Sequence, residues 1–456
     1  MARSTILPEA PSELPPSSGS RRESALTLSI LNRVLARYGP RDFAIRLWDG
    51  TSVPADPGME TRFTLVLKQP GALRRMMLPP NELSLGEAYL DDDWDLEGDV
   101  LAAMRLGDVF EDVALGIGDL VGLTRQLMSL PKERGVDGHS AGRQRADLGG
   151  AEHSKDRDRK AITYHYDIGN DFFKLFLDKR MVYSCAYFPT GEEDLDTAQE
   201  AKLDHICRKL RLKPGERLLD IGCGWGGMIM HAAERFGVQA MGITLSQPQA
   251  DLANQRIASA GLSDRCRAVV MDYRDVAASG PFDKIVSVGM VEHVGRAKLP
   301  TYFRSAWQAL KPGGLFLNHG ITAAARDKGS SNPLDRYVFQ RGAFIRKYVF
   351  PDGELIPLGD MDGIAERVGF EVRDVESLRE HYALTLKHWV ERLESHQEEA
   401  RQQVDERTYR VWRLYMAGCS HAFTTARLSI HQTLLSKPDK SGQSHLPWSR
   451  SDLYNQ

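Results

Sequence analysis

The stretch Leu218-Leu219-Asp220-Ile221-Gly222-Cys223-Gly224-Trp225-Gly226-Gly227 decides the fold. Its apolar start has the pattern of a buried strand, and a helical pattern follows its glycines. Glycines in such a turn let the backbone bend tightly and approach a ligand closely. Because Gly222, Gly224 and Gly227 also satisfy the dinucleotide fingerprint, the turn alone leaves a nicotinamide or flavin cofactor open.

Strand and helix patterns alternate on both sides of this turn. Such alternation predicts a parallel, doubly wound α/β sheet, whose ligands bind at the carboxyl ends of the strands. Beyond Arg379 the apolar residues are spaced for long helices with buried faces, which predicts a helical C-terminal elaboration. The expected strands span residues 217–221, 238–243, 268–271, 284–288 and 314–318.

Changes in composition divide the 456 residues into five expected segments. Proline and serine dominate a disordered N-terminal tail, and apolar residues nearly vanish in a solvated linker. The segments are the tail over 1–24, a small α+β accessory domain over 25–130, the linker over 131–160, the cofactor domain over 161–436 and a C-terminal tail over 437–456.

The overall composition is that of a globular protein, with 42% hydrophobic and 27% charged residues. A net charge of −3 gives no general attraction to nucleic acid. Five cysteines without a CxxC pair indicate neither a zinc site nor a disulfide framework, and fit a reduced cytosolic compartment. No uncharged apolar run reaches about 18 residues, so we expect a protein that does not span a membrane.

Two features beside the glycine turn separate the candidate cofactors. Asp220 lies two residues before the first glycine, where its carboxylate can hold the ammonium group of an amino-acid ligand. A dinucleotide fold instead places an acid about 20 residues after the glycines, to bind the ribose hydroxyls. This sequence has 244–249 (Thr-Leu-Ser-Gln-Pro-Gln) there, and no acid until Asp251. The dinucleotide interpretation therefore loses its second support, whereas a ligand with an amino-acid group fits Asp220.

Several blocks in order resemble one family, the cyclopropane-fatty-acyl-phospholipid synthases and the related mycolic acid cyclopropane synthases and methyltransferases. The blocks are His165-Tyr166-Asp167-Ile168-Gly169-Asn170-Asp171-Phe172-Phe173, Tyr183-Ser184-Cys185-Ala186-Tyr187-Phe188, the glycine turn, and Val286-Ser287-Val288-Gly289-Met290-Val291-Glu292-His293-Val294-Gly295. The resemblance implies a Rossmann-like class I methyltransferase domain. It also implies methyl transfer from S-adenosylmethionine to a cis double bond of an acyl chain in phospholipid.

The resemblance also implies where the cofactor binds. The expected contacts are Tyr183, Ser184, Asp220, Gly222, Cys223, Gly224, Thr244, Leu245 and Gln249, with Tyr273 and Arg274 at the adenine end. In this family the positions of Thr244 and Gln249 supply the polar contacts that a carboxylate gives elsewhere. No metal is expected.

Methyl transfer to an alkene leaves a carbocation, and closing a cyclopropane requires a base in a water-poor pocket. Aromatic faces can stabilise the cation, and the candidates are Tyr183, Tyr187, Phe188, Trp225 and Tyr382. The family holds a bicarbonate ion as the base, and the matching positions are Cys185, Glu292, His319 and Tyr382, with backbone help near Ile321. Beside that anion, Glu292 is expected either to have a raised pKa or to accept the bicarbonate hydroxyl.

Cys419 matches a cysteine regarded as active in the family. Attack on a sulfonium needs no nucleophilic side chain, so a buried cysteine near the acyl tunnel is the alternative. The sequence departs from many relatives at Gly320, where they carry a small hydroxyl residue. An acyl methyltransferase that makes methyl-branched or methylene lipid is therefore the alternative function.

A lipid substrate implies a cytoplasmic enzyme bound peripherally to the inner face of the membrane, with a homodimer as a candidate assembly. Basic and aromatic residues interleave over 344–351, which predicts either a membrane contact or a lid over the cofactor pocket. Two further classes stay open: a non-catalytic lipid-binding or regulatory protein, and a nicotinamide oxidoreductase.

Overall fold

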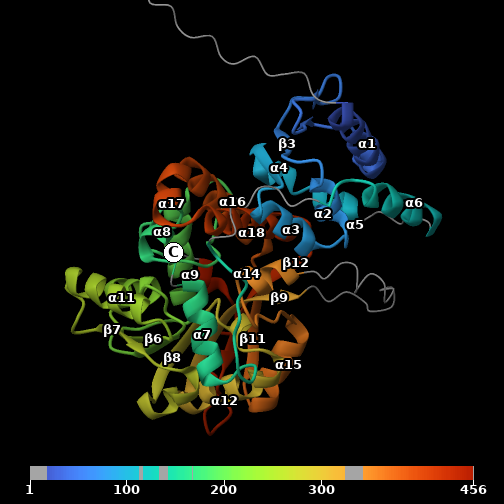
Figure 1. Cartoon of the computed structure of the whole chain (residues 1–456). Helices are drawn as coiled ribbons and strands as arrows, with labels where there is room; N and C mark the ends of the chain where they lie inside the picture. The colour runs from blue at the N-terminus through green and yellow to red at the C-terminus, as the bar shows by residue number, and fades with distance from the viewer. Residues whose placement is uncertain (1–17, 112–116, 133–141, 167, 324–341, 455–456) are drawn as a thin grey trace, which may run out of the picture. The chain divides into compact units, whose positions relative to one another are not determined.

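The computed structural model describes residues 18–111, 117–132, 142–166, 168–323 and 342–454. The chain divides into two compact units, residues 1–140 and 141–456 (Figure 1). Most of the expected N-terminal tail, residues 1–17, lies outside the described residues, as do residues 133–141 of the expected linker.

The first unit is a small α+β fold. Its sheet has the order β2-β1-β3-β4, in which β1 and β3 are parallel and the two outer pairs are antiparallel. Phe43 and Phe63 lie opposite each other on β1 and β3, with their rings stacked at 4.7 Å. The elements are α1 (Ser18–Val34), η1 (Leu35–Arg37), β1 (Phe43–Arg46), β2 (Ser52–Val53), β3 (Phe63–Leu67), α2 (Ala72–Met77), α3 (Glu82–Leu90), β4 (Trp94–Gly98), α4 (Val100–Ala103), α5 (Leu106–Glu111) and α6 (Ile117–Met128).

The second unit contains a larger sheet with the order β11-β12-β9-β8-β5-β6-β7, and β10 pairs with β9. Five neighbouring strands, β5 to β9, are parallel, which confirms the predicted doubly wound sheet. The strand β12 is antiparallel to β9, and this addition was not predicted. The strands are β5 (Arg217–Ile221), β6 (Gln239–Thr244), β7 (Cys266–Val270), β8 (Phe282–Val288), β9 (Leu310–Ala323), β10 (Ile356–Pro357), β11 (Glu371–Ser377) and β12 (Leu428–Ser436).

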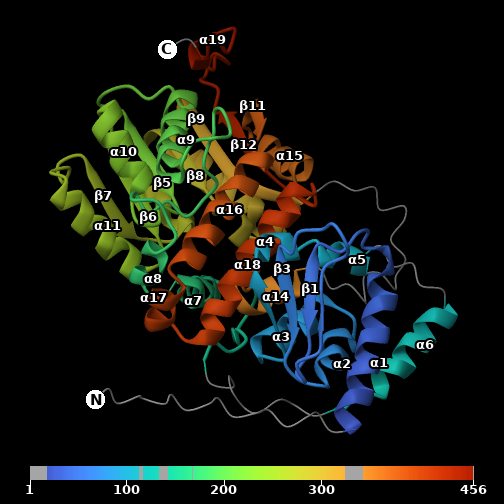
Figure 2. The same ribbon diagram turned by 90° about the horizontal axis from the view of Figure 1, so that it is seen from above.

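Successive strand residues bury themselves in two different cores, because side chains alternate between the faces of a sheet. Leu218 packs in a core with residues of α9, α10 and α11, and Leu219 packs in a core with residues of α12 and α15. Figure 2 shows α10 and α11 beside β6 and β7, and α15 beside β11. The sheet is thus covered on both faces, as a parallel sheet requires.

The remaining elements of this unit are mostly helical. They are α7 (Lys155–Tyr166), α8 (Asn170–Lys174), α9 (Leu195–Lys209), α10 (Gly227–Phe236), α11 (Gln247–Ser259), η2 (Tyr273–Ser279), η3 (Val291–His293), η4 (Arg296–Lys298), α12 (Leu299–Ala309), α14 (Ala343–Tyr348), α15 (Leu358–Val368), α16 (Arg379–Ser395), α17 (Gln397–Gln403), α18 (Glu406–Thr424) and α19 (Ser451–Tyr454). The long helices α16 and α18 pack against each other and form the predicted C-terminal elaboration.

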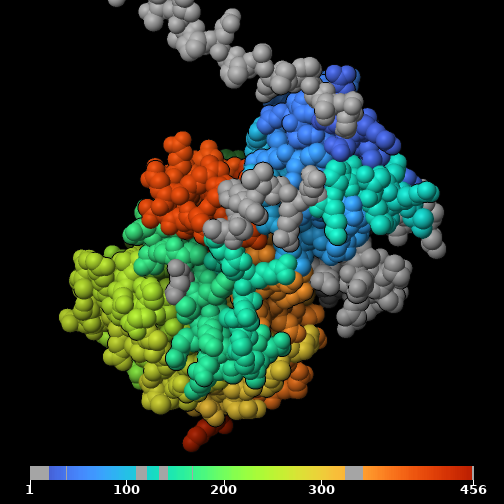
Figure 3. All heavy atoms as spheres, viewed as in Figure 1, coloured from blue at the N-terminus to red at the C-terminus, as the bar shows by residue number. Residues whose placement is uncertain are grey.

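Residues 142–160 of the expected linker belong to the second unit. The Arg143 guanidinium donates to Tyr348 O at 2.8 Å, and Arg157 forms an ion pair with Asp352. Helix α7 begins within this segment, and the space-filling view shows its green spheres on the surface of the second unit (Figure 3). Its polar composition reflects arginine hydrogen bonds rather than a free linker.

The expected tails also contain ordered elements. At the N-terminus α1 already includes residues 18–24, and Ser24 is buried. At the C-terminus the Lys437 ammonium donates to Trp307 O and Leu310 O, at 2.6 and 2.7 Å. Within the described ranges, no helix is both long enough and apolar enough to cross a bilayer.

Candidate functional site

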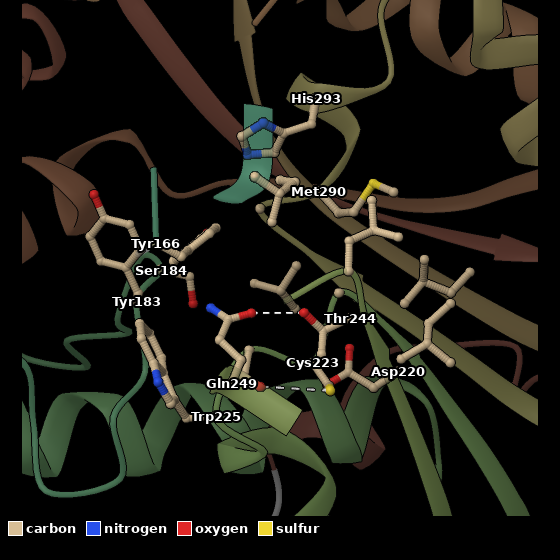
Figure 4. A pocket seen from close by; sticks show the side chains of 18 of the residues that line it. Tyr166, Tyr183, Ser184, Asp220, Cys223, Trp225, Thr244, Gln249, Met290 and His293 are labelled. Atoms are coloured by element: carbon tan, nitrogen blue, oxygen red, sulfur yellow. Dashed lines mark hydrogen bonds between the residues drawn. The ribbon is translucent and has the colours of Figure 1, made fainter. Parts of the chain in front are cut away.

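All eleven predicted cofactor contacts line one cavity at the carboxyl ends of β5, β6 and β8. In Figure 4 the rings of Tyr166, Tyr183 and Trp225 lie on one side of this cavity, and Asp220, Cys223 and Thr244 lie on the other. The eleven residues are Tyr183, Ser184, Asp220, Gly222, Cys223, Gly224, Thr244, Leu245, Gln249, Tyr273 and Arg274. Their grouping follows from the parallel sheet, which brings the strand ends to one edge.

The glycine turn is shaped for close approach. Gly222 has φ +91°, a conformation that side chains disfavour, and an added Cβ would lie 3.1 Å from the Met290 side chain. The backbone N–H groups of Gly222 and Cys223 both donate to Ile243 O at 2.9 Å. These bonds tie the turn to β6, so the cavity wall is fixed before any ligand binds.

Asp220 is a buried carboxylate at the end of β5. Its Oδ1 has no hydrogen-bond partner within the described residues. Burial raises its pKa to about 7, and the nearby Lys202 lowers it in part. Because an unpaired buried carboxylate costs free energy, the site fits a ligand that brings a positive charge, such as the ammonium group of S-adenosylmethionine.

Thr244 and Gln249, which are predicted to take the place of the ribose acid, are bonded to each other. Thr244 Oγ1 donates to Gln249 Oε1 at 2.8 Å, which the dashed line in Figure 4 marks. That bond occupies the amide oxygen and leaves the amide N–H groups as donors for a hydroxyl. Ser246 caps the N-terminus of α11. Its hydroxyl oxygen accepts a hydrogen bond from the backbone N–H of Gln249 at 3.3 Å, which holds Gln249 in place.

The predicted adenine end is held by an ion-pair cluster. The Arg274 guanidinium contacts Asp272 Oδ2 at 2.5 Å and Asp158 Oδ2 at 2.8 Å. Asp158 belongs to α7, so the segment expected as a linker closes this end of the cavity. Two carboxylates therefore fix the position of the Arg274 side chain, which forms part of the cavity wall.

The cavity is also lined by residues that were not predicted as contacts, among them Tyr166, Lys202, Met290 and His293. Burial lowers the pKa of His293 to about 4, so this imidazole is neutral near pH 7. Tyr166 and His293 lie inside sequence blocks that resemble the family, which was a usable signal. Lys202 looks like an ordinary lysine of a surface helix, and nothing in the sequence marks it.

The predicted catalytic residues form a second group, and none of them lines the cofactor cavity. Burial raises the pKa of Tyr382 well above its ordinary value, and three other predicted residues, Cys185, Cys419 and Glu292, add to the rise. Burial and Glu292 likewise raise the pKa of Tyr166. Since Tyr166 also lines the cavity, it joins the two groups.

Glu292 begins the helical turn after β8 with one satisfied oxygen. Its Oε1 accepts from Ile321 N at 2.6 Å, whereas its buried Oε2 has no partner within the described residues. Burial raises the pKa of Glu292 to about 7, and the Ile321 bond opposes the rise. The raised pKa was predicted, and here burial alone supplies it.

His319 lies on β9, two residues before Ile321. It is the one predicted catalytic residue that does not contribute to the raised pKa of Tyr382. Its Nδ1 faces Gln432 Nε2 at 3.4 Å, and its buried Nε2 has no partner within the described residues. Burial lowers its pKa well below the ordinary value. With Gln432 as the donor, the neutral ring carries its proton on Nε2, where it can donate to an anion.

The candidate aromatic residues separate into two sets. Tyr183 and Trp225 line the cavity, and the Tyr183 ring lies 5.0 Å from that of Trp389. In contrast, Tyr187 stacks between His205 and His381, at 4.4 and 4.9 Å, and Phe188 stacks on His388. Neither Tyr187 nor Phe188 lines the cavity, so both fit a packing role.

The segment over 344–351 is closer to a lid than to a membrane contact. Phe344 and Tyr348 are buried, and Phe350 stacks on His165 at 4.1 Å. Pro351 and the following Asp352 line the cavity. The aromatic side chains of this segment therefore pack inside the second unit.

The two candidate cysteines are both buried. The Cys185 thiol donates to Ala186 O at 3.2 Å, and burial raises its pKa far above the ordinary value. A protonated thiol is a donor and not a nucleophile. Cys419 lies on α18. Its electrostatic interaction contributes to the raised pKa values of Tyr183, Tyr382 and Tyr415. Across the described ranges, no cluster of three or more His, Cys, Asp or Glu side chains is placed to hold a metal.

Comparison with known proteins agrees with this geometry. A family model described as mycolic acid cyclopropane synthetase matches residues 153–433, and one described as a domain of unknown function matches residues 30–107. The chain is 42% identical over 410 residues to a probable fatty acid methyltransferase of Pseudomonas putida, covering 90% of this chain and 95% of the relative.

Two further proteins carry the likeness. The chain is 34% identical over 413 residues to the cyclopropane-fatty-acyl-phospholipid synthase of Escherichia coli K12, covering 91% of this chain and 94% of the relative. It is 33% identical to the mycolic acid cyclopropane synthase CmaA1, solved in complex with SAH and CTAB, with a TM-score of 0.56 over 61% of this chain and 97% of that chain. The chain belongs to the mycolic acid cyclopropane synthetase family, and it is an S-adenosylmethionine-dependent methyltransferase.

Proposed function

We propose that the protein transfers the methyl carbon of S-adenosylmethionine to a cis double bond in an acyl chain of membrane phospholipid, and that the product is a cyclopropane. The observation that carries this proposal is the buried Glu292, which has an unpaired oxygen and a pKa of about 7 beside the cofactor cavity. A base in this position would serve to remove the proton that closing a cyclopropane requires. The name of the Escherichia coli relative supports the acceptor.

The cofactor supplies an activated methyl group on a sulfonium. Asp220 would hold its ammonium group, and the Gln249 amide would bind a ribose hydroxyl. The glycine turn would pass close to the ligand because Gly222 carries no side chain. The described residues thus fit the cofactor with both charged and neutral contacts.

The first chemical step forms a carbon–carbon bond. The π electrons of the alkene attack the methyl carbon as the sulfur–carbon bond breaks, so the positive charge moves from sulfur to the acyl chain. Tyr183 and Trp225 place aromatic faces along the cavity, and cations are stabilised within about 6 Å of such faces. The phenol of Tyr183 is held by Tyr415 at 3.2 Å, which keeps its ring in place.

The second step removes a proton from the transferred methyl group, and the electron pair of that C–H bond closes the ring. Bicarbonate fits the unpaired atoms of the second group and would supply the base. Its hydroxyl would donate to Glu292 Oε2, and its oxygens would accept from His319 Nε2 and the Tyr382 hydroxyl. Both Glu292 Oε2 and His319 Nε2 are buried without partners in the described part of the protein.

The test is an incubation with methyl-labelled S-adenosylmethionine and vesicles of monounsaturated phospholipid, followed by mass analysis of the acyl chains. The expected product gains CH2, and removing dissolved carbonate slows its formation until bicarbonate is restored. An absence of label in the lipid would overturn the proposal.

A second candidate is a methyltransferase that adds a methyl group to carbon of the lipid acyl chain and gives methyl-branched or methylene lipid. It is favoured by the name of the Pseudomonas putida relative and by Gly320. An added Cβ at Gly320 would lie 2.2 Å from Val291 Cγ1, so a valine methyl occupies the place of a side chain in the wall beside Glu292. A reduced branch carries two more hydrogens than the cyclopropane and requires a reductant, which the same mass analysis detects.

Peripheral binding to the inner face of the membrane and a cytoplasmic location belong to this proposal, since the acceptor lies in a bilayer. Co-sedimentation with phospholipid vesicles measures the binding. The candidate homodimer stays a prediction, which light scattering on the purified protein measures.

A further inference from the structure

A buried lysine lies in the wall of the cofactor cavity. Lys202 comes from α9 and is 1% exposed. Its ammonium donates a hydrogen bond of 2.9 Å to Ser184 Oγ, which is its one hydrogen bond within the described residues. An ammonium has three donors, and burying it is costly unless they find acceptors. The arrangement therefore calls for a further acceptor on the cavity side.

A second buried lysine on the same helix, Lys209, has carboxylate partners for its ammonium group. Lys209 is also 1% exposed, and its ammonium contacts Glu376 Oε2 at 2.5 Å and Asp374 Oδ2 at 3.4 Å. Lys202 has no such ion pair in the described part of the protein, although Asp178 and Asp220 act on it from a distance. Of these two buried lysines, only Lys202 borders the cavity.

We propose that Lys202 supplies the positive charge that binds the carboxylate of the methionine part of S-adenosylmethionine, beside the Ser184 hydroxyl. The inference rests on the cofactor assignment of the proposed function and adds a contact to it. Lys202 and Asp220 then form a matched pair, one for the carboxylate of the ligand and one for its ammonium group.

The order of the strands supports this orientation. The predicted adenine contacts follow β7, and Thr244 ends β6, the neighbouring strand. Asp220 lies on β5, the next strand in the sheet. A ligand that runs along these strand ends therefore places its amino-acid end beside β5. Lys202 lies there, since it lowers the pKa of Asp220.

The electrostatics of the pair agree with a zwitterionic ligand. Burial lowers the pKa of Lys202 to about 8 and raises that of Asp220 to about 7. Burial disfavours the charged form of each group, and the attraction between Lys202 and Asp220 offsets this only in part. A bound amino-acid head would bring a further opposite charge to each group.

The test compares two ligands that differ only in the carboxylate: S-adenosylhomocysteine and its decarboxylated analogue. Calorimetry on the full-length protein measures both dissociation constants. The substitution Lys202→Met should weaken S-adenosylhomocysteine by ~10- to 100-fold, as expected for the loss of a charged hydrogen bond, and leave the analogue nearly unchanged. The wild-type preference for the carboxylate is then lost.

Two further variants keep the test decisive. Lys202→Gln retains a donor toward Ser184 without the charge, and it should show the same selective loss if Lys202→Met does not fold. Gln199→Leu is the matched control, because Gln199 lies on the same helix and donates to Ser184 O at 2.8 Å and Val182 O at 3.3 Å. It loosens the same loop without removing charge, so it should weaken both ligands by the same factor.

The inference fails if a folded Lys202 variant binds S-adenosylhomocysteine as the wild type does, or loses both ligands equally. Its failure is distinct from that of the lipid proposal. A protein that shows the predicted selectivity and yet labels no lipid would retain the Lys202 assignment and lose the acceptor. If the protein labels lipid but the Lys202 variants lose both ligands equally, the lipid acceptor is retained and the Lys202 assignment is lost.

Discussion

The cofactor cavity and the group around Tyr382 differ in how their polar side chains are paired, although the cavity also holds the unpaired Asp220 oxygen. In the cavity, Thr244 is bonded to Gln249 and Arg274 to two carboxylates. Around Tyr382, Glu292 has a buried oxygen without a partner in the described structure, and so has a ring nitrogen of the nearby His319. Under the proposed function, the first region binds the cofactor and the second holds the proton-transfer groups. Substitutions in the two regions should therefore have separable effects on binding and on turnover.

The largest expected effect is on turnover. Glu292→Gln removes the group that accepts a proton or the bicarbonate hydroxyl, and general acid–base groups contribute roughly 10²- to 10⁴-fold. Lipid labelling should fall by that factor, while the dissociation constant of S-adenosylhomocysteine stays near that of the wild type. Unchanged labelling would remove Glu292 from the mechanism. An equal loss of S-adenosylhomocysteine binding would show that the two regions do not have separate roles.

The same variant should reveal the cost of burying the carboxylate. The pKa of Glu292 is raised from 4.5 to about 7 in the folded protein, so the folded state binds the extra proton and its stability falls as pH rises between these values. Above pH 7 the penalty is about 3 kcal/mol. Denaturant unfolding should therefore show that the stability of Glu292→Gln relative to wild type increases from pH 5 to pH 8. A constant difference would contradict the raised pKa.

Asp220→Asn tests the binding region. The amide keeps the shape of the side chain but loses the charge that holds an ammonium group, so S-adenosylhomocysteine should bind ~10- to 100-fold more weakly. Turnover at saturating cofactor should change much less than in Glu292→Gln. A variant that binds the cofactor normally would show that the unpaired Asp220 oxygen has another role.

Gly320 offers a gentler perturbation of the proton-transfer region. Gly320→Ala would place a Cβ 2.2 Å from Val291 Cγ1 and 3.7 Å from Glu292 Oε1. Overpacking of this kind costs about 1–3 kcal/mol. Turnover should fall with little change in cofactor binding, and Val291→Ala in the same protein should restore part of it by making room. If the double variant is no better than the single one, the contact with Val291 is not the cause.

The smallest effect is expected at Cys419. Methyl transfer from a sulfonium needs no thiol nucleophile, so Cys419→Ser should change labelling by no more than about 3-fold. Cys185→Ser is the matched comparison, because that thiol also acts on Tyr382 and has a polar role that serine retains. Loss of all labelling in Cys419→Ser would make this cysteine a catalytic residue.

Local patterns were sufficient for the parts of the fold that depend on neighbouring residues. The strand β5 has the predicted bounds, because its apolar run and the glycines after it are both local signals. The strands β11 and β12 were missed, since the antiparallel pairing of β12 with β9 joins residues far apart in the sequence. The expected linker was misjudged because arginine bonds to carbonyl oxygens leave no apolar pattern.

The site follows the same rule. Asp220 and the glycine turn could be read from spacing, and the second group could be named only through the resemblance. Lys202 could not be found in either way, since its burial depends on how α9 packs over the loop that carries Ser184. Tyr187 and Phe188 were plausible aromatics in sequence, but the rings of His205, His381 and His388 engage them elsewhere.

The central claim is that one enzyme transfers a methyl group and then removes a proton from it. S-adenosylmethionine with a fully deuterated methyl group tests both steps at once, in vesicles of monounsaturated phospholipid. We predict acyl products that keep two of the three deuterium atoms, because the third leaves with the base. Products that keep all three would show methyl transfer without ring closure and would contradict the role given to Glu292.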